Sequence, residues 1–375
     1  MARRGKDEAR LALGVPVPPV WLARAANRLR NRLGYLHGAM VPGFALVLER
    51  LLWLVDNKAL FCAVDLGVPD LLAERPRHAA EIADATGANP DAVERLLRFL
   101  VSRGLFTRDS DGRYANNGAT EILRKDHAYG WRDWVLFFGS DWNAQIWNQM
   151  PGRVRRAESA TRAAFGEPFF DYVNRKNPDA KSAFNGAMAA GSRLQALLFA
   201  DAIDFSSTST LCDVGGGSGS VVVQLLRRHP HLRGTVFDLP DLAAAATALF
   251  EAHGVQDRAS FRGGDFFAAV PSGSDVYTLF AIIHDWDDER CVRILRNIAV
   301  ALPPHGRIMV VEKPLPHGNE NDVARATDMI MLMLGDGGRE RTVEEYEALF
   351  ASAQLRVQRR FTLPSLFEVF VLVPG

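Results

Sequence analysis

The chain has 375 residues, of which 48% are hydrophobic and 23% are charged, and its formal net charge is zero. This length allows two domains, and the composition is typical of a soluble globular protein. A neutral charge balance argues against a protein that binds nucleic acid or a membrane surface. Because no run of about 18 uninterrupted apolar residues is present, a membrane-spanning helix is not expected, and we expect a cytoplasmic protein.

The cysteines and the first residues of the chain exclude two further classes. Cys62, Cys212 and Cys291 lie far apart within apolar patterns. They therefore predict reduced core residues, with neither a disulfide framework nor a metal site. The basic segment 1–19 is interrupted by acids and ends in V-P-V-P-P, which disfavours a helix. We interpret it as a flexible leader and not as a targeting segment.

Residues 20–125 predict a mostly helical domain that ends in a winged helix. Apolar residues recur at helical spacing in 21–36 and 44–55, and helices this apolar need a partner surface. A second subunit is the natural candidate, and packing on the same chain is the alternative. Three further helices and a hairpin follow. They are expected at 59–66, 78–86, 91–103 and 105–114.

A winged helix has two common uses, and the sequence bears on both. DNA binding would use Arg95, Arg98 and Arg103 on the second helix of the motif. A scaffold or dimerisation module would instead bury the apolar face of that helix. Since Glu94 lies among the arginines and the net charge is zero, dimerisation is favoured, although a fold alone does not decide function.

The region 126–200 is predicted to be a helical linker rich in aromatic side chains. Most of these aromatics are expected in the core, while a minority are candidates for lining an apolar pocket that accepts a flat substrate. Phe184 and Met188 share one helix face that suits the same pocket. Ser192 follows one helical turn later.

The stretch 209–220, S-T-L-C-D-V-G-G-G-S-G-S, organises the rest of the chain. Its pattern is strand, glycine turn and helix, which is the first unit of a nucleotide-binding sheet. Gly215, Gly216 and Gly217 suit the turn because glycine tolerates positive φ and lets a ligand lie against backbone N–H groups. A glycine turn alone is weak support, because ordinary tight turns contain the same pattern.

Two later strand ends strengthen the interpretation. A second strand ends at Asp238, where an acid can accept hydrogen bonds from ribose hydroxyls. A third leads into Gly264, Asp265 and Phe266. Together these features predict one adenosine-sized ligand. Asp213 beside the glycines would repel a pyrophosphate but attract a cationic methionyl group, so S-adenosylmethionine is favoured over a dinucleotide.

The remaining elements bring a histidine and two glutamates to the same sheet. A fourth strand, 275–283, runs into His284, and a fifth ends at Glu312. Glu340 lies in the loop G-G-R-E-R-T, which precedes a helix with a capping box. A histidine supported by carboxylates is what proton abstraction from a hydroxyl requires. The alternative for His284 is a histidine at a helix start, capped by its neighbour.

These motifs, taken in order, resemble one enzyme family. D-V-G-G-G-S-G, F-D-L-P, G-D-F-F, H-D-W-D-D-E, V-E-K-P-L-P and G-G-R-E-R-T look like those of S-adenosylmethionine-dependent O-methyltransferases of the caffeate and acetylserotonin type, over about residues 40–375. The resemblance implies an α/β fold with an N-terminal, mostly helical winged-helix dimerisation domain and a C-terminal Rossmann-like catalytic domain at 201–375. It also implies a homodimer whose substrate pocket lies between the domains.

The resemblance also implies roles for individual residues. His284 is expected as the general base, supported by Glu312 and Glu340. The expected cofactor contacts are Ser192, Asp213, Gly215, Gly216, Gly217, Asp238, Leu239, Gly264, Asp265, Phe266 and Phe280. The expected substrate contacts are Trp134, Phe138, Phe184, Met188, Asp285, Met329 and Met333. Phe280 stands where many plant members have lysine, and we interpret it as a partner for the adenosyl group.

The sequence therefore predicts methyl transfer from S-adenosylmethionine to a phenolic hydroxyl of a small aromatic metabolite. Two alternatives stay open. A relative of the same fold would use the cofactor to assist hydroxylation, and a transcription regulator would use the winged helix to bind DNA.

Overall fold

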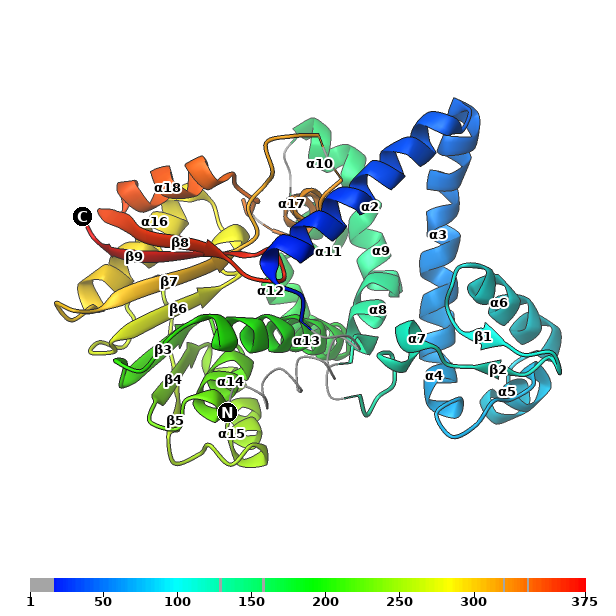
Figure 1. The fold of residues 1–375 in the computed structure, drawn as a ribbon, viewed down its shortest axis with the longest axis horizontal. Helices are drawn as coiled ribbons and strands as arrows, with labels where there is room; N and C mark the ends of the chain where they lie inside the picture. The colour runs from blue at the N-terminus through cyan, green and yellow to red at the C-terminus, as the bar shows by residue number, and fades with distance from the viewer. Residues whose placement is uncertain (1–16, 128–129, 157–158, 320, 336) are drawn as a thin grey trace. The chain divides into compact units, whose positions relative to one another are not determined.

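The computed structural model describes residues 17–375 except 128–129, 157–158, 320 and 336, and most of the predicted leader lies outside the described residues. The chain forms two compact units, which we describe separately (Figure 1). The N-terminal unit comprises 32–148 and 173–190, and the C-terminal unit comprises the remaining described residues. Among the described residues, no helix is both long enough and apolar enough to cross a membrane.

The C-terminal unit is built on a seven-stranded sheet with the order β5-β4-β3-β6-β7-β9-β8. The first five strands are parallel, and β9 and β8 add an antiparallel edge. This is the predicted Rossmann-like arrangement. The strands are β3 (Thr210–Val214), β4 (Arg233–Asp238), β5 (Ala259–Gly263), β6 (Val276–Phe280), β7 (Arg307–Glu312), β8 (Leu355–Thr362) and β9 (Glu368–Pro374).

The strand order reverses between β3 and β6, and ligands of open α/β sheets bind at the carboxyl ends of the strands beside such a switch point. The predicted site residues at the ends of β3, β4, β5, β6 and β7 therefore lie along one edge of the sheet. The helices of this unit include α14 (Ser220–Arg228), α15 (Ala243–Ala252), α16 (Asp288–Ala301), α17 (Val323–Leu334) and α18 (Val343–Ser352).

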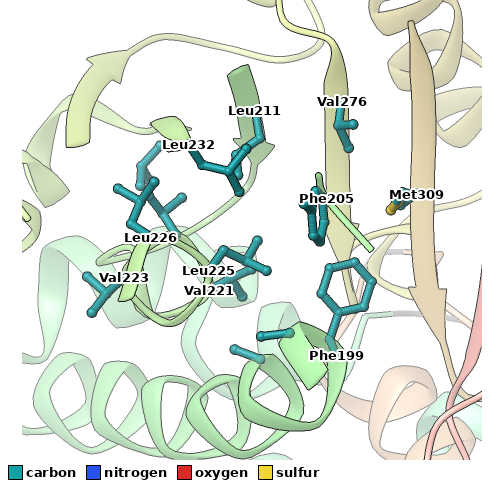
Figure 2. Close-up of a cluster of buried hydrophobic side chains, with 14 of the residues drawn as sticks. Phe199, Phe205, Leu211, Val221, Val223, Leu225, Leu226, Leu232, Val276 and Met309 are labelled. Atoms are coloured by element: carbon teal, nitrogen blue, oxygen red, sulfur yellow. The ribbon is translucent and has the colours of Figure 1, made fainter. Parts of the chain in front are cut away.

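Alternating strand residues supply the two cores that hold the sheet. Met309 of β7 belongs to one cluster with helix α14, whereas Ile308 belongs to the other with α16 and α18, as the period of two in a strand requires. Figure 2 shows Val221 and Leu225 of α14 in the first cluster, with Phe199 of α13 (Pro178–Ala202) nearby. Both faces of the sheet are thus covered, as parallel sheets require.

The N-terminal unit contains the predicted winged helix. Its helices α5 (Ala79–Thr86) and α6 (Pro90–Ser102) are followed by the hairpin β1 (Thr107–Arg108) and β2 (Tyr114–Ala115). Around this motif lie α3 (Gly43–Asp65), α4 (Val68–Leu71), α7 (Gly118–Glu121), α8 (Arg132–Gly139) and α9 (Asp141–Trp147). Of the three arginines that DNA binding would use, Arg103 makes a bidentate pair with Asp56, at 2.6 Å for both contacts.

Two expectations for the N-terminal unit were wrong. The helices expected at 44–55 and 59–66 are one continuous helix, α3, because Asp56, Asn57 and Lys58 include neither glycine nor proline to end it. Cys62 is exposed on this helix and is not a core residue, whereas Cys212 and Cys291 are buried as expected. Its exposure follows from α3 presenting apolar side chains that no described residue covers.

The exposed apolar side chains of this unit lie on α3 and on the end of α2 (Val20–Met40). They are Leu33, Tyr35, Leu36, Met40, Phe44, Val47, Leu48, Leu51, Leu52, Trp53, Leu54 and Val55. We call this set the α3 apolar surface. Exposed apolar areas of this kind mark interaction sites in folded proteins.

Burial of α14 against the sheet predicts a difference between two equal substitutions. Val221→Ala in α14 removes buried methyl groups and is expected to lower the free energy of unfolding by roughly 2 kcal/mol, from lost burial and the cavity left behind. Val300→Ala in α16 alters a side chain that is 88% exposed and is expected to have little effect. Urea unfolding followed by circular dichroism measures both, and equal effects would contradict the packing.

Candidate active site

The glycine turn after β3 is a tight backbone cradle. Gly215 and Gly217 have φ of 73° and 59°, which suits glycine. A Cβ at Gly215 would also come within 2.6 Å of the Ile282 side chain, and one at Gly216 within 2.5 Å of Asp213. No larger residue fits at either position without displacing its neighbours. The turn before α14 is therefore held in place by its own packing, and the N–H groups of Gly215 and Gly217 donate to the Phe237 carbonyl and to Asp238, both at 2.8 Å.

Asp213 lies beneath this turn. Its side chain is buried, and Oδ1 accepts a hydrogen bond of 2.6 Å from the Thr278 hydroxyl. Its Oδ2 is also buried and has no hydrogen-bond partner among the described residues. Burial raises the pKa of Asp213 to about 7. An orphaned carboxylate oxygen under the turn fits a ligand that brings a positive charge or N–H donors.

The acids after β4 and β5 are brought to the same edge. Asp238 accepts hydrogen bonds from the backbone N–H groups of Gly217, at 2.8 Å, and of Leu239, at 2.7 Å. Leu239 is an exposed apolar side chain directly beside it. Asp238 pairs in register with Gly263, so Gly264 and Asp265 follow next to it. A half-buried acid beside an exposed apolar side chain suits a ribose and an adenine ring.

The structure does not test the roles of two other predicted cofactor contacts, Phe280 and Ser192. The ring of Phe280 packs edge-on against Phe199, with ring centroids 4.7 Å apart. Its proposed contact with an adenosyl group stays a prediction. Ser192 is half-buried on α13, and its role also stays a prediction.

The backbone turns sharply before His284. The strand expected to reach residue 283 ends at Phe280, because Ala281 has φ of 51°, which breaks the extended conformation. A residue other than glycine is strained at positive φ, and such strain is frequent at functional sites. A short 3-10 turn, Ile283–Asp285, follows. This turn sets the direction of the imidazole.

Two buried glutamates lie on one side of the imidazole. His284 Nδ1 is 2.9 Å from Glu340 Oε1 and 3.8 Å from Glu312 Oε2. Glu312 also accepts backbone hydrogen bonds from Ile283, at 2.8 Å, and from His284, at 3.3 Å. In the neutral ring this arrangement assigns the proton to Nδ1, which donates to Glu340, and leaves the Nε2 lone pair free to accept a proton.

The charges around His284 decide its basicity. Burial acts to lower the pKa of His284, but the negative charges of Glu312, Asp285 and Glu340 outweigh it and raise the pKa to about 10. Burial has the opposite effect on a carboxyl group and raises the pKa of Asp285 to about 6. Asp285 Oδ1 lies 3.5 Å from His284 Nε2. Burial raises the pKa of Glu312 as well, while the imidazolium opposes that shift. The site therefore strongly favours a protonated imidazole in the free protein.

Aromatic rings gather beside this turn. Trp286 stands perpendicular to Phe267, with centroids 4.8 Å apart, and also contacts Phe266 and Phe170. Trp286, Phe267 and Phe170 were not predicted as site residues. Two of them, Phe267 and Trp286, lie in the runs G-D-F-F and H-D-W. In these runs aromatic residues stand next to acids at strand ends, and this pattern is the sequence signal that identifies them.

The predicted substrate contacts divide between the two units. Met329 of α17 is exposed, whereas Met333 is fully buried. In the N-terminal unit, the rings of Trp134 and Phe138 stack with centroids 5.7 Å apart. Phe184 and Met188 are carried by α13 in the same unit. That residues of both units line one cavity stays a prediction.

The same histidine and glutamates are a possible metal-binding set. His284, Glu312 and Glu340 each offer one donor atom, and these atoms lie within 4.8 Å of one another. The hydrogen bond of 2.9 Å between Nδ1 and Glu340 already uses the nitrogen that a metal would need. The arrangement is therefore better suited to holding and moving a proton.

Two family models match the chain. Residues 147–356 match an O-methyltransferase domain, and residues 48–126 match an O-methyltransferase dimerisation domain. The first match covers more than half of the chain and contains the glycine turn, His284, Glu312 and Glu340.

Individual relatives are similar over most of their length. A phenazine O-methyltransferase from Lysobacter antibioticus is 35% identical over 85% of this chain and 93% of its own. A mitomycin biosynthesis 6-O-methyltransferase from Streptomyces lavendulae is 38% identical over 80% and 86%. A solved O-methyltransferase from neocarzinostatin biosynthesis, in complex with S-adenosylmethionine and 2-hydroxy-5-methyl naphthoic acid, has a TM-score of 0.71 at 34% identity, covering 85% of this chain and 96% of that one.

The contact between His284 and Glu340 predicts a change in a measurable pKa. Glu340→Gln removes a negative charge from beside Nδ1, so the pKa of His284 is expected to fall from about 10 by about one unit or more. An NMR titration of the ring, assigned by comparison with His284→Ala, measures it. Glu347→Gln, which alters a half-exposed carboxylate, is the control. An unchanged or higher pKa in Glu340→Gln would contradict the geometry.

Proposed function

Because the chain belongs to the family of S-adenosylmethionine-dependent O-methyltransferases, we propose that it methylates a phenolic hydroxyl of a small aromatic molecule, with His284 as general base. The predicted family, N-terminal dimerisation domain and cofactor class are confirmed. One observation carries the proposal: two buried carboxylates hold the mostly buried imidazole on its Nδ1 side, at 2.9 and 3.8 Å, so that Nε2 lies on the opposite side of the ring.

The residues at the strand ends would hold the cofactor. We assign Asp238 to the ribose hydroxyls and the backbone of Gly215 to Gly217 to the methionyl end, with Asp213 beneath it. When bound, S-adenosylmethionine supplies an electrophilic methyl group, so that a C–O bond forms as the C–S bond breaks and the electron pair stays on sulfur.

His284 performs the proton chemistry in this proposal. Its Nε2 accepts the proton of the acceptor hydroxyl, while Glu340 and Glu312 stabilise the imidazolium that results. The products are a methoxy compound and S-adenosylhomocysteine, and the proton leaves later from Nε2. Asp285, close to Nε2 and partly exposed, is placed to hydrogen-bond a polar group of the acceptor.

The acceptor class is supported by two observations. The relatives are named for phenazine, mitomycin, 3-amino-4-hydroxybenzoate and naphthoate substrates or pathways, and aromatic rings surround Trp286 in this chain.

We also propose that the protein is a homodimer. Residues 48–126 match a dimerisation domain, and the α3 apolar surface is exposed in the single chain among the described residues. A second copy would bury that surface. A cytoplasmic location and the absence of a nucleic-acid partner stay predictions. The retained His284, Glu312 and Glu340 favour methyl transfer over cofactor-assisted hydroxylation.

Removal of the imidazole tests the proposed base. His284→Ala is expected to lower turnover by about 10²-fold to 10⁴-fold, the range typical of a general base, and to leave S-adenosylhomocysteine binding within a few fold. A labelled-methyl screen of phenols first identifies an acceptor, and calorimetry measures cofactor binding. His317→Ala, at an exposed histidine, is the control. Turnover near that of the wild type in His284→Ala would overturn the assignment.

A charge placed on the α3 apolar surface tests the dimer. Leu51→Lys is expected to raise the dissociation constant of the dimer strongly, because a lysine would be buried in an apolar interface without a partner. Val300→Lys, at an exposed valine of α16, should leave the dimer intact. Sedimentation velocity distinguishes the two, and an unchanged dimer in Leu51→Lys would refute this interface.

A further inference from the structure

Arg341 is a fully buried arginine that the proposed proton transfer does not use directly. A buried guanidinium is costly unless its N–H groups are paired. Here Nε and Nη2 donate to Asp288 Oδ1 at 2.9 and 2.7 Å. Nη2 also donates to the carbonyl of Trp286 at 2.8 Å, and Nη1 donates to that of Ile283 at 3.2 Å. The side chain thus contacts several backbone and side-chain acceptors at once.

The positions of these acceptors are informative. Ile283 directly precedes His284, and Trp286 follows it by two residues, so Arg341 holds the 3-10 turn on both sides of the imidazole. Glu340, the partner of His284 Nδ1, is the residue next to Arg341 in the chain. One side chain therefore joins the segment that carries the base to the segment that carries its supporting carboxylate.

Backbone contacts reinforce this connection at close range. The N–H of Arg339 donates to the carbonyl of His284 at 2.8 Å. The N–H of Glu340 donates to Asp328 Oδ1 of α17 at 3.0 Å. A Cβ at Gly338 would come within 2.7 Å of the His284 carbonyl oxygen, so the loop lies directly against the turn. Small changes in this loop would move Glu340 relative to the imidazole.

From these contacts we propose that Arg341 is a positioning residue, which keeps Glu340 aligned with His284 so that Nδ1 carries the proton and Nε2 faces the acceptor. This proposal rests on the proposed function of His284. Lysine would keep the positive charge, but its single ammonium group cannot reproduce the planar fork that reaches Asp288 and both carbonyls. Arg341→Lys therefore changes the alignment while conserving the charge.

The test compares Arg341→Lys with wild type and with Arg293→Met, which alters an exposed arginine of α16. Arg341→Lys is expected to lower kcat by about tenfold to hundredfold, the range that small misplacement of reacting groups produces. The KM for the acceptor and the affinity for S-adenosylhomocysteine should change less than about threefold by the same argument. The pKa of His284, measured by NMR titration, should fall toward that of Glu340→Gln. Arg293→Met should resemble the wild type in every readout.

A double substitution separates positioning from a general structural role. If Arg341 acts through Glu340, adding Arg341→Lys to Glu340→Gln should lower kcat and the pKa of His284 little further. Additive losses, or an unchanged kcat and pKa in Arg341→Lys, would overturn the proposal. Should Arg341→Lys fail to fold, Asp288→Asn, which weakens the same fork, is measured in its place with the same outcomes.

The two proposals fail in different ways. Full turnover in His284→Ala would remove the proposed base, yet the NMR titration of Arg341→Lys would still report on the alignment of His284 and Glu340. A normal pKa of His284 in Arg341→Lys, with turnover lost in His284→Ala, would overturn the role of Arg341 alone.

Discussion

The buried contact between His284 Nδ1 and Glu340 is the interaction on which the site depends. Burial alone would make the imidazole a weaker base, but three carboxyl groups reverse the effect and raise its pKa to about 10. The arrangement is costly, because one oxygen each of Glu312 and Glu340 is buried without a hydrogen-bond partner among the described residues. Together with the strained Ala281, this cost is the expected mark of a functional site.

The same negative charges connect the base with its proposed cofactor. A site rich in carboxylates attracts a sulfonium cation, and a bound cation in turn opposes protonation of a nearby imidazole by Coulomb repulsion. In the proposed mechanism, binding of the cationic cofactor would therefore lower the high pKa that His284 has in the free protein and favour loss of its Nε2 proton, so that Nε2 could then accept the proton of the acceptor. In the proposed mechanism, charge in this site therefore serves both cofactor binding and proton transfer.

Much of this site could be predicted because of sheet geometry. Parallel strands place their carboxyl ends on one edge, so Asp238, His284 and Glu312 could be grouped from sequence alone. The contacts by which Asp328 and Arg341 hold Glu340 and the 3-10 turn could not be predicted, because they depend on the path of the loop that returns from α17 to that turn. The early end of β6 was also missed, since nothing in the preference of alanine signals a positive φ.

Prediction from the sequence was limited in the same way for the N-terminal unit. Helical periodicity predicted its helices and the winged helix, but the apolar pattern predicted two helices, 44–55 and 59–66, where α3 is continuous. The exposure of Cys62 could not be read from an apolar helix pattern, because the pattern does not say which face finds a partner.

The most direct test of the account uses a series of ring-substituted acceptors with decreasing hydroxyl pKa, at one fixed pH. The measured quantity is the ratio of wild-type turnover to that of His284→Ala. If His284 acts as a general base, the ratio is large for hydroxyls that are protonated at that pH and falls toward one for those already ionised. A ratio that does not change with acceptor acidity would contradict the role of His284 as the base.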